Sequence, residues 1–229
     1  MTDPTVAFSD PTSVSGYAER TMRLVPGLRD LHRMIGILIA ERVPPDARVL
    51  VLGAGGGLEL RALAGMQSGW RFDGVDPSRE MLELARTALG EHQARVTLHE
   101  GYIDTAPSGP FDAATCLLTL HFLDKAERQR TVREVFRRLK PAAPFVTAHH
   151  SFPREESDKW LRRNAAFAAS SAVSAAQTED SVRMMKKRLP ALSPKEDEDI
   201  LRECGFSSVE LFYAAFTFKG WVAYTPDRS

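Results

Sequence analysis

The sequence has little cysteine, no net charge and no long apolar run. Two cysteines occur in 229 residues, Cys116 and Cys204, and neither falls in a Cys/His spacing that would hold zinc. We expect both to be buried thiols in a reducing compartment, because disulfide frameworks belong to oxidising ones. No apolar run approaches a membrane span and no signal-peptide pattern opens the chain. We therefore expect a cytoplasmic protein with no metal centre and no membrane association.

The charged residues balance, with 30 Lys and Arg against 30 Asp and Glu. A nucleic-acid-binding surface needs a concentration of basic side chains, so we expect no DNA partner. The run Lys186-Lys187-Arg188 is more typical of a solvated helix face than of an RNA contact. The length suits one α/β domain with a modest insertion, so residues 1–229 are interpreted as a single domain.

A strand that breaks into glycines is the strongest local signal. Val49–Leu52 is apolar without alternation, as expected for a parallel strand buried on both faces. Gly53, Gly55 and Gly57 follow, ahead of a helical segment. Backbone N–H groups at such a helix start can bind the polar end of a nucleotide. Leu58 excludes the dinucleotide spacing, and no Gly-Lys-Ser/Thr follows for a P-loop. A tight turn without ligand is the alternative interpretation.

An acidic residue strengthens the nucleotide interpretation. Arg71–Val75 reads as a second strand that ends in Asp76, about twenty residues beyond the glycines. A carboxylate at that place in a doubly wound sheet accepts hydrogen bonds from ribose hydroxyls. Pro77 suits a first helical turn, so Asp76 could also act as a helix cap. Met81, one turn later, is placed either against an adenine ring or in the core.

Strands and helices alternate along most of the chain, which predicts an α/β protein with a parallel, doubly wound sheet. Helices are expected at 17–24, 28–41 and 77–89, after a cap at Asp124, and after a capping box at Ser193 with Glu196. Strands are expected at 49–52, 71–75, 95–99, 111–118 and 144–148. A hairpin at 208–214 and 217–224 supplies the last two strands.

Two stretches depart from this alternation. Residues 1–13 are polar and rich in Pro, Ser and Thr, which predicts a loose arm. Residues 154–189 form one or two further helices between the fifth and sixth strands. Ligands bind at the carboxyl ends of strands in open α/β sheets. The insertion leaves the sheet at that edge, so we expect a lid over the site or a homodimer surface.

The whole chain from about residue 20 resembles the class I S-adenosylmethionine (SAM) methyltransferases. The glycine pattern resembles their first motif. The chain is most similar to the carboxy-SAM synthase branch, which supplies a donor for tRNA wobble-uridine modification. The stretches that carry this similarity are Leu24-Val-Pro-Gly27, Met34-Ile-Gly36, Thr119-Leu-His-Phe-Leu123, Glu127-Arg-Gln129, Gly205-Phe206 and Val209-Glu-Leu-Phe212.

The resemblance implies a Rossmann-like methyltransferase fold with a mostly parallel seven-stranded sheet, helices on both faces, an antiparallel last strand and a helical lid insertion. It implies SAM as the cofactor. The residues it places around SAM are Gly53, Ala54, Gly55, Asp76, Pro77, Met81, Tyr102, Ile103 and Leu117.

The chain also departs from these relatives. Many of them have an acidic residue where Val51 stands, and an Asp for the adenine amine where Tyr102 stands. Asp104 or a carbonyl would have to replace the latter. The synthase branch has a Tyr and an Asn near its donor where this chain has Leu28 and Leu117. It also has an Arg for the carboxylate of its donor, which Arg183 could supply.

Methyl transfer from a sulfonium is an in-line displacement with a neutral leaving group, so it requires no acid, and positioning can supply much of the rate. A base is needed only if the acceptor must lose a proton. Candidate bases are His121, after the fourth strand, and His149 and His150, which end the fifth. The alternatives are a packed or cofactor-lining His121 and a solvated His149-His150 pair.

The function we expect from the sequence is methyl transfer from SAM to an unidentified small-molecule acceptor. A carboxy-SAM synthase that uses SAM and prephenate is the second hypothesis. A SAM-binding module without catalysis is the third.

Overall fold

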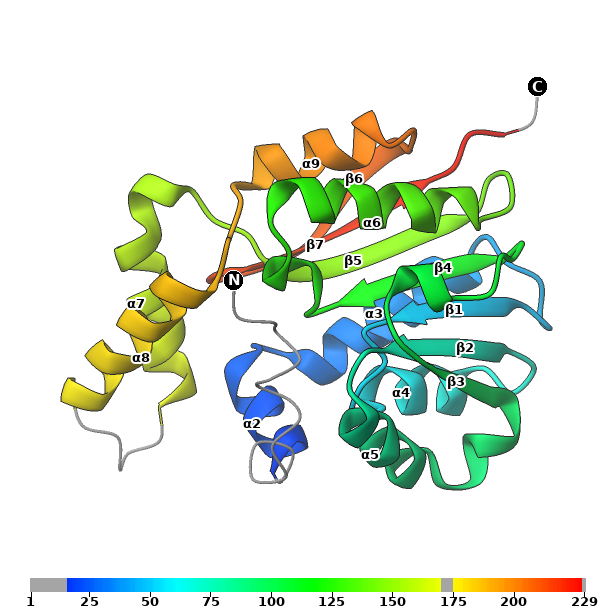
Figure 1. Ribbon diagram of the computed structural model, residues 1–229, viewed down its shortest axis with the longest axis horizontal. Coiled ribbons are helices and arrows are strands. Elements are labelled where there is room, and N and C mark those ends of the chain that lie inside the picture. The colour runs from blue at the N-terminus through cyan, green and yellow to red at the C-terminus, as the bar shows by residue number, and fades with distance from the viewer. Residues whose placement is uncertain (1–15, 170–174, 228–229) are drawn as a thin grey trace.

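The computed structural model describes residues 16–169 and 175–227 (Figure 1). A seven-stranded sheet has the order β3-β2-β1-β4-β5-β7-β6. Strands β1 to β5 are parallel, and β7 is antiparallel to both of its neighbours. The predicted topology is therefore confirmed. The strands are β1 (Arg48–Leu52), β2 (Arg71–Asp76), β3 (Val96–Glu100), β4 (Ala113–Leu117), β5 (Pro144–His150), β6 (Ser207–Ala215) and β7 (Phe218–Tyr224).

Helices cover both faces of this sheet (Figure 1). Apolar stripes on α3 and α4 pack into one hydrophobic core, and those on α6 and α9 pack into another. The helices outside the insertion between β5 and β6 are α2 (Tyr17–Leu24), α3 (Leu28–Ala40), α4 (Leu58–Met66), α5 (Arg79–Leu89), α6 (Lys125–Arg137) and α9 (Pro194–Glu203). Short 3-10 turns are η2 (Gly90–Arg95), η3 (Ile103–Thr105) and η4 (Leu120–Phe122).

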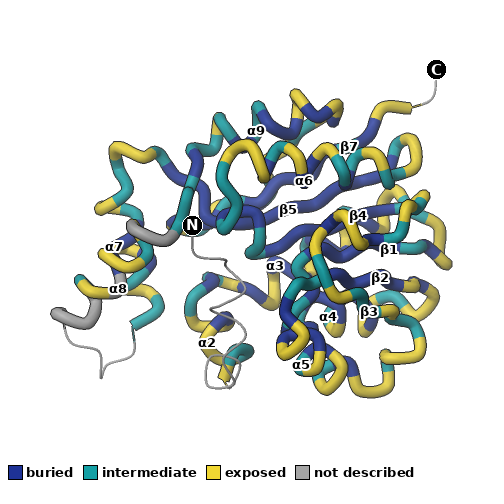
Figure 2. Tube along the Cα trace, viewed as in Figure 1, coloured by how far each residue is buried: buried dark blue, intermediate teal, exposed yellow. Residues whose placement is uncertain are grey.

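Strand β1 is buried on both faces, as its unbroken apolar pattern predicts. Val49 and Val51 belong to the core under α3 and α4, whereas Leu50 and Leu52 belong to the core under α6 and α9. Side chains alternate between the two sides of a strand, so each face needs its own apolar partners. Figure 2 shows the central strands buried and the outer helix surfaces exposed.

Polar caps set the helix starts. The Asp124 side chain accepts a hydrogen bond from Glu127 N (2.9 Å) and begins α6. A complete capping box joins Ser193 and Glu196 at α9, with Pro194 in its first turn. Helix α5 begins two residues later than predicted, because Ser78 is its cap and accepts a hydrogen bond from Met81 N (3.2 Å).

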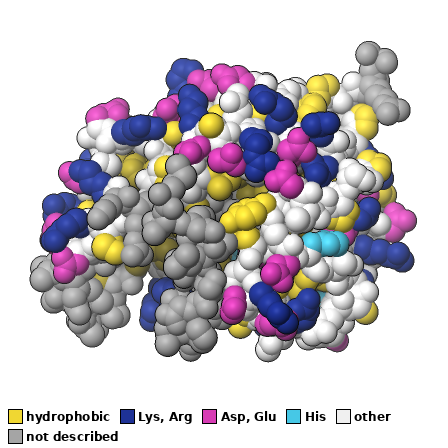
Figure 3. Space-filling view, viewed as in Figure 1, with side chains coloured by type: hydrophobic (Ala, Val, Ile, Leu, Met, Phe, Trp, Pro, Cys, Tyr) yellow, Lys and Arg dark blue, Asp and Glu magenta, His cyan; other side chains and the backbone are white. Residues whose placement is uncertain are grey.

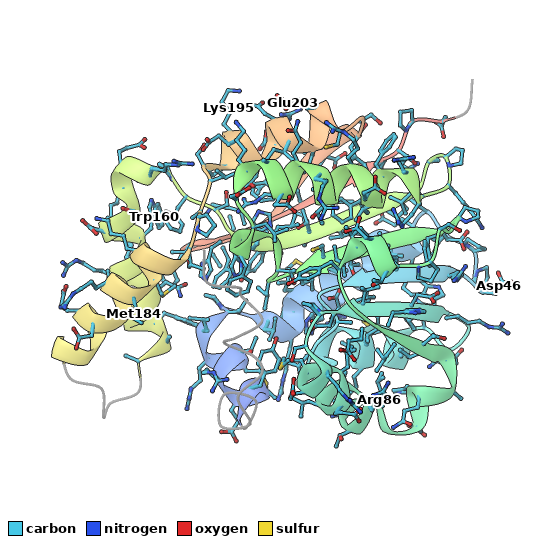
Figure 4. All side chains as sticks on the ribbon, viewed as in Figure 1. Asp46, Arg86, Trp160, Met184, Lys195 and Glu203 are labelled. Carbon is cyan, nitrogen blue, oxygen red and sulfur yellow. The ribbon has the colours of Figure 1, made fainter. Side chains whose placement is uncertain are left out.

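The insertion between β5 and β6 contains η5 (Arg154–Glu156), α7 (Ser157–Ala168) and α8 (Ala175–Arg188). It has a small core of Phe152, Leu161 and Val182, and α7 packs against α2. Figure 4 places Trp160 and Met184 in this region, away from the main sheet. The predicted basic run is described only at Lys186, which pairs with Asp158 (2.9 Å). The predicted arm at 1–13 lies outside the described residues.

Charges of both signs are interspersed on the face seen in Figure 3. The described part of the chain has no helix with both the length and the apolar character that a membrane crossing requires. It also holds no cluster of three or more His, Cys, Asp or Glu side chains that could bind a metal. Cys116 and Cys204 are free and buried, as predicted.

Candidate active site

The glycine turn brings β1 against the end of β2. Gly53 N and Ala54 N donate hydrogen bonds to Val75 O (2.8 and 3.0 Å). Position 55 requires glycine, because the Asp76 and Met81 side chains lie close to its backbone. A Cβ there would lie 2.6 Å from Asp76 Oδ2 and 2.8 Å from Met81 Cβ. Since a real Cβ does not tolerate such distances, any side chain at Gly55 would displace the Asp76 carboxylate.

Asp76 is held by two backbone N–H groups. Its Oδ2 accepts a hydrogen bond from Gly55 N (2.9 Å) and its Oδ1 accepts one from Ser78 N (2.9 Å). Burial raises the pKa of Asp76, and these two hydrogen bonds oppose the rise. The helix cap is Ser78 rather than Asp76. A carboxylate has about four acceptor positions, so Asp76 retains lone pairs for the hydroxyls of a ligand.

A cavity of about 290 Å³ opens beside Asp76. It lies where the carboxyl ends of β1, β2 and β4 meet, which is where open α/β sheets bind ligands. Most of the residues predicted around SAM line it, namely Gly53, Gly55, Asp76, Pro77, Met81, Tyr102, Ile103 and Leu117. Ala54 instead lines a smaller second cavity, on the α3 and α4 side of the glycine turn.

Several residues that line the cavity were not among those predicted from the sequence. Tyr17 reaches the cavity from α2, and the wall after β4 is formed by Leu118, Thr119, Phe122 and Leu123. Helix α6 adds a polar edge through Glu127, Arg130 and Thr131. The cap at Asp124 marks a helix that starts close to the end of β4, which is a signal for the α6 contribution. No comparable signal marks Tyr17, because its position depends on the packing of α2.

Asp104 does not border the cavity. Its carboxylate forms an ion pair with Arg130, with Nη1 2.9 Å from Oδ1 and 3.0 Å from Oδ2. Arg130 also pairs with Glu127. The suggestion that Asp104 accepts the adenine amine therefore requires this exposed ion pair to open. The backbone around Tyr102 and Ile103, which does line the cavity, is the nearer alternative.

The three histidines proposed as bases are buried and lie outside the described cavity wall. His121, His149 and His150 are 4%, 1% and 3% exposed, and none of them lines either cavity. The solvated-loop alternative for His149 and His150 is wrong, because both residues belong to β5 and pair with β7. Lys219 lies opposite His149, and Phe218 lies opposite His150.

Burial keeps two of these rings neutral. His150 Nδ1 lies 2.8 Å from Thr217 Oγ1, and its ring stacks on Phe218 with centroids 4.0 Å apart. Burial lowers the pKa of His150 to about 3 and holds that of His121 well below its ordinary value. The His121 Nδ1 atom accepts a hydrogen bond from His150 N (3.3 Å). His121 and His150 therefore have a structural role, as buried neutral side chains that hydrogen-bond within the protein.

His149 belongs to a buried charge network. Its Nε2 lies 3.2 Å from Asp197 Oδ1. Arg128 Nη1 donates a hydrogen bond to the same oxygen (2.5 Å), and Arg128 and Asp197 are almost fully buried. Arg128 lies on α6, and Asp197 lies on α9. The network therefore joins two helices to β5 on the face of the sheet that they cover.

A family comparison agrees with this geometry. Residues 49–142 match the model of a methyltransferase domain. That range begins in β1 and includes the glycine turn, Asp76 and all of β4. This part of the chain is therefore a methyltransferase domain on the class I fold, and such a domain uses SAM as its cofactor.

Individual proteins are similar to this chain over nearly its whole length. The carboxy-S-adenosyl-L-methionine synthase of Campylobacter fetus subsp. fetus is 22% identical over 220 residues, covering 94% of this chain and 93% of that protein. The methyltransferase of a Haloferax volcanii complex with the Trm112 activator superposes with a TM-score of 0.66 at 18% identity, covering 99% of both chains. Human N-acetylserotonin methyltransferase, solved with SAM, gives 0.59 at 12% identity, covering 95% of this chain and 60% of that one.

Proposed function

We propose that the protein transfers the methyl group of SAM to a small-molecule acceptor. The observation that carries this proposal is the Asp76 carboxylate, fixed by Gly55 N at the edge of the cavity. Its remaining lone pairs suit the two ribose hydroxyls. The apolar side chains of Met81 and Ile103, together with the Tyr102 ring, suit the faces of an adenine.

Positioning is the main contribution we assign to the chain. Bound SAM supplies an electrophilic methyl group, and its leaving thioether is neutral. The cavity wall after β4, with Leu117, Leu118 and Phe122, excludes water and aligns an acceptor with that group. Holding two reactants in line supplies several kcal/mol of barrier lowering. The wall is largely apolar, which favours an acceptor of small size and low charge.

The buried histidines narrow the acceptor chemistry. A general base must reach the proton it removes, and His121, His149 and His150 lie outside the described cavity wall. We therefore expect an acceptor that is already nucleophilic, such as an amine, a thiolate or an acidic phenol. Glu127, at the α6 edge of the cavity, is the carboxylate left to assist proton transfer.

The carboxy-SAM alternative rests on the similarity to the Campylobacter fetus synthase. A carboxylate beside the sulfonium would need a cation or several donors. Arg183 has a side chain that is 77% exposed and pairs with Asp180 (2.9 Å), outside the described cavity wall. Leu117 lines the main cavity and Leu28 the second one, and neither side chain donates a hydrogen bond. These features support SAM over carboxy-SAM as the donor.

The insertion is proposed to cover the bound donor. Helix α7 packs against α2, and α2 supplies Tyr17 to the cavity wall. Ligand contacts with Tyr17 would therefore reach α7 through α2. We expect amide hydrogen exchange in residues 157–168 to slow when S-adenosylhomocysteine is added. Protection confined to the glycine turn would instead favour a fixed surface, such as a homodimer contact.

The proposed function is tested with methyl-labelled SAM and fractionated small metabolites. We expect S-adenosylhomocysteine to accumulate only with a fraction that gains the label, and the reaction to be lost in Asp76→Ala. A parallel incubation supplies SAM and prephenate and is analysed by mass. Catalytic formation of carboxy-SAM that is lost in Arg183→Ala would establish the synthase instead. Binding of SAM without turnover of any fraction would favour a module without catalysis.

A further inference from the structure

A second cavity continues the first one behind the glycine turn. Its volume is about 30 Å³, which admits a small head group and no ring. The two cavities share five lining residues on α2, the glycine turn and the end of β4, namely Tyr17, Gly53, Gly55, Leu117 and Leu118. The second cavity therefore adjoins the main one across these residues, close to a ligand that Asp76 would hold.

Glu59 is the acidic side chain of this second cavity. It lies in the first turn of α4 and is 8% exposed. Its Oε1 atom has no hydrogen-bond partner among the described residues. Burial raises the pKa of the carboxyl to about 8, and a hydrogen bond with the Thr115 side chain opposes that rise. A buried carboxyl group that is incompletely paired destabilises a fold. A ligand group in the cavity that pairs with the Glu59 Oε1 atom would remove that cost.

The described surroundings of Glu59 supply no cation. The other lining side chains are apolar or carry no charge at neutral pH, and the described wall contains no Lys or Arg. His32 faces the cavity from α3, but burial lowers its pKa to about 4, so its ring is neutral. The Tyr17 phenol on α2 is neutral as well, because burial raises its pKa.

We propose that the second cavity binds the ammonium group at the amino-acid end of the donor, with Glu59 as its hydrogen-bond acceptor and counter-ion. This inference rests on the proposed use of SAM and deepens it. Gly55 borders both cavities, so the 5′ substituent of an adenosine held by Asp76 would extend along it, and the ammonium group is small enough for the space. When the ammonium group binds, the Glu59 carboxyl releases its proton to solvent. The resulting carboxylate stabilises the cation through a charge-assisted hydrogen bond.

The test is a thermodynamic cycle that removes the Glu59 carboxyl from the protein, the ammonium group from the ligand, or both, and compares the binding affinities. Calorimetry measures S-adenosylhomocysteine and its deaminated analogue, 4-(adenosylthio)butanoate, on the wild-type protein and on Glu59→Gln. We expect the wild type to bind the analogue at least 30-fold more weakly. We expect Glu59→Gln to bind both ligands within threefold of each other. Glu83→Gln, an exposed acid on α5, is the matched control and should keep the wild-type preference.

The outcomes separate this inference from the proposed function. Equal binding of both ligands by the wild type, or full discrimination in Glu59→Gln, overturns the Glu59 subsite and leaves the proposed function standing. Absence of S-adenosylhomocysteine binding to the wild type overturns both. Glutamine matches the protonated carboxyl in size, so the variant should fold. The wild-type comparison of the two ligands holds independently of that variant.

Discussion

Two polar regions lie at the carboxyl ends of strands in the same sheet, and they differ in their surroundings. At the end of β2, Asp76 borders a cavity of about 290 Å³. At the end of β5, His149 and His150 are packed against β7 and buried. The cavity region leaves acceptor positions for a ligand, whereas the histidine region places its rings against protein.

The difference arises from the elements that pack against each strand end. After β2 the chain turns into α5, so the strand end stays open toward the cavity. Strand β5 is paired along its full length with the antiparallel β7, and Asp197 approaches His149 from α9. Position at a strand end therefore predicts where a polar residue lies along the sheet. It does not predict whether another element covers that residue.

The largest expected effect is in the packed region. Asp197→Ala leaves Arg128 buried without its partner, which should lower the free energy of unfolding by about 3–5 kcal/mol. Urea denaturation measures this loss. Affinity for S-adenosylhomocysteine in the folded variant should stay within threefold. A loss of stability below about 1 kcal/mol would show that the two regions are less different than their burial indicates.

The open region should show the reverse pattern. Asp76→Ala removes the acceptor for two ribose hydroxyls and should weaken SAM binding by roughly 2 kcal/mol or more, which is about 30-fold. Its stability should fall less than that of Asp197→Ala, because the Gly55 and Ser78 N–H groups left unpaired border the cavity, where water can replace the carboxylate. Asp76→Asn keeps the shape and serves as the matched variant. Unchanged affinity by calorimetric titration would remove Asp76 from the site.

Glu59 gives a pH test on the cavity side. Its pKa is about 8 in the folded protein against an ordinary 4.5. Above pH 4.5 the unfolded chain ionises this group while the folded protein keeps it protonated. The contribution of this group to the free energy of unfolding is therefore fully present below pH 4.5 and is lost as the pH rises toward 8. The loss between pH 6.5 and 8 is at most about 2 kcal/mol.

Denaturation at several pH values measures this slope, and Glu59→Gln should flatten it. The window from pH 6.5 upward avoids His121 and His150, whose lowered pKa values make stability fall as pH drops below about 6.5. A slope that Glu59→Gln leaves unchanged would show that another group titrates there.

The smallest effect is expected at Arg183. Its ion pair with Asp180 is exposed at the surface, and such pairs contribute little stability. Arg183→Ala should change the free energy of unfolding by less than about 0.5 kcal/mol and leave SAM affinity unchanged. A tenfold loss of affinity, measured calorimetrically, would place the insertion at the donor and reopen the carboxy-SAM hypothesis.

Local sequence signals predicted the glycine turn, Asp76 at the end of β2, and the caps at Asp124 and Ser193. Each of these depends on residues close together in the chain. The second cavity could not be predicted, because Glu59 reads as an ordinary polar residue of a helix until α3 packs over it. Burial of His149 depends on β7, about 70 residues later in the chain. Contacts of that kind arise from tertiary packing and leave no local pattern.

The strand order has a consequence for how the sheet is completed. Strand β7 lies between β5 and β6, although it comes after both in the chain. Until residues 218–224 are synthesised, β5 presents an unpaired edge and β6 has no neighbour in the sheet. Open edges of this kind favour aggregation. A ribosome that stalls after residue 215 would therefore release a chain with an interior strand missing, which chaperones would have to shield until it is degraded.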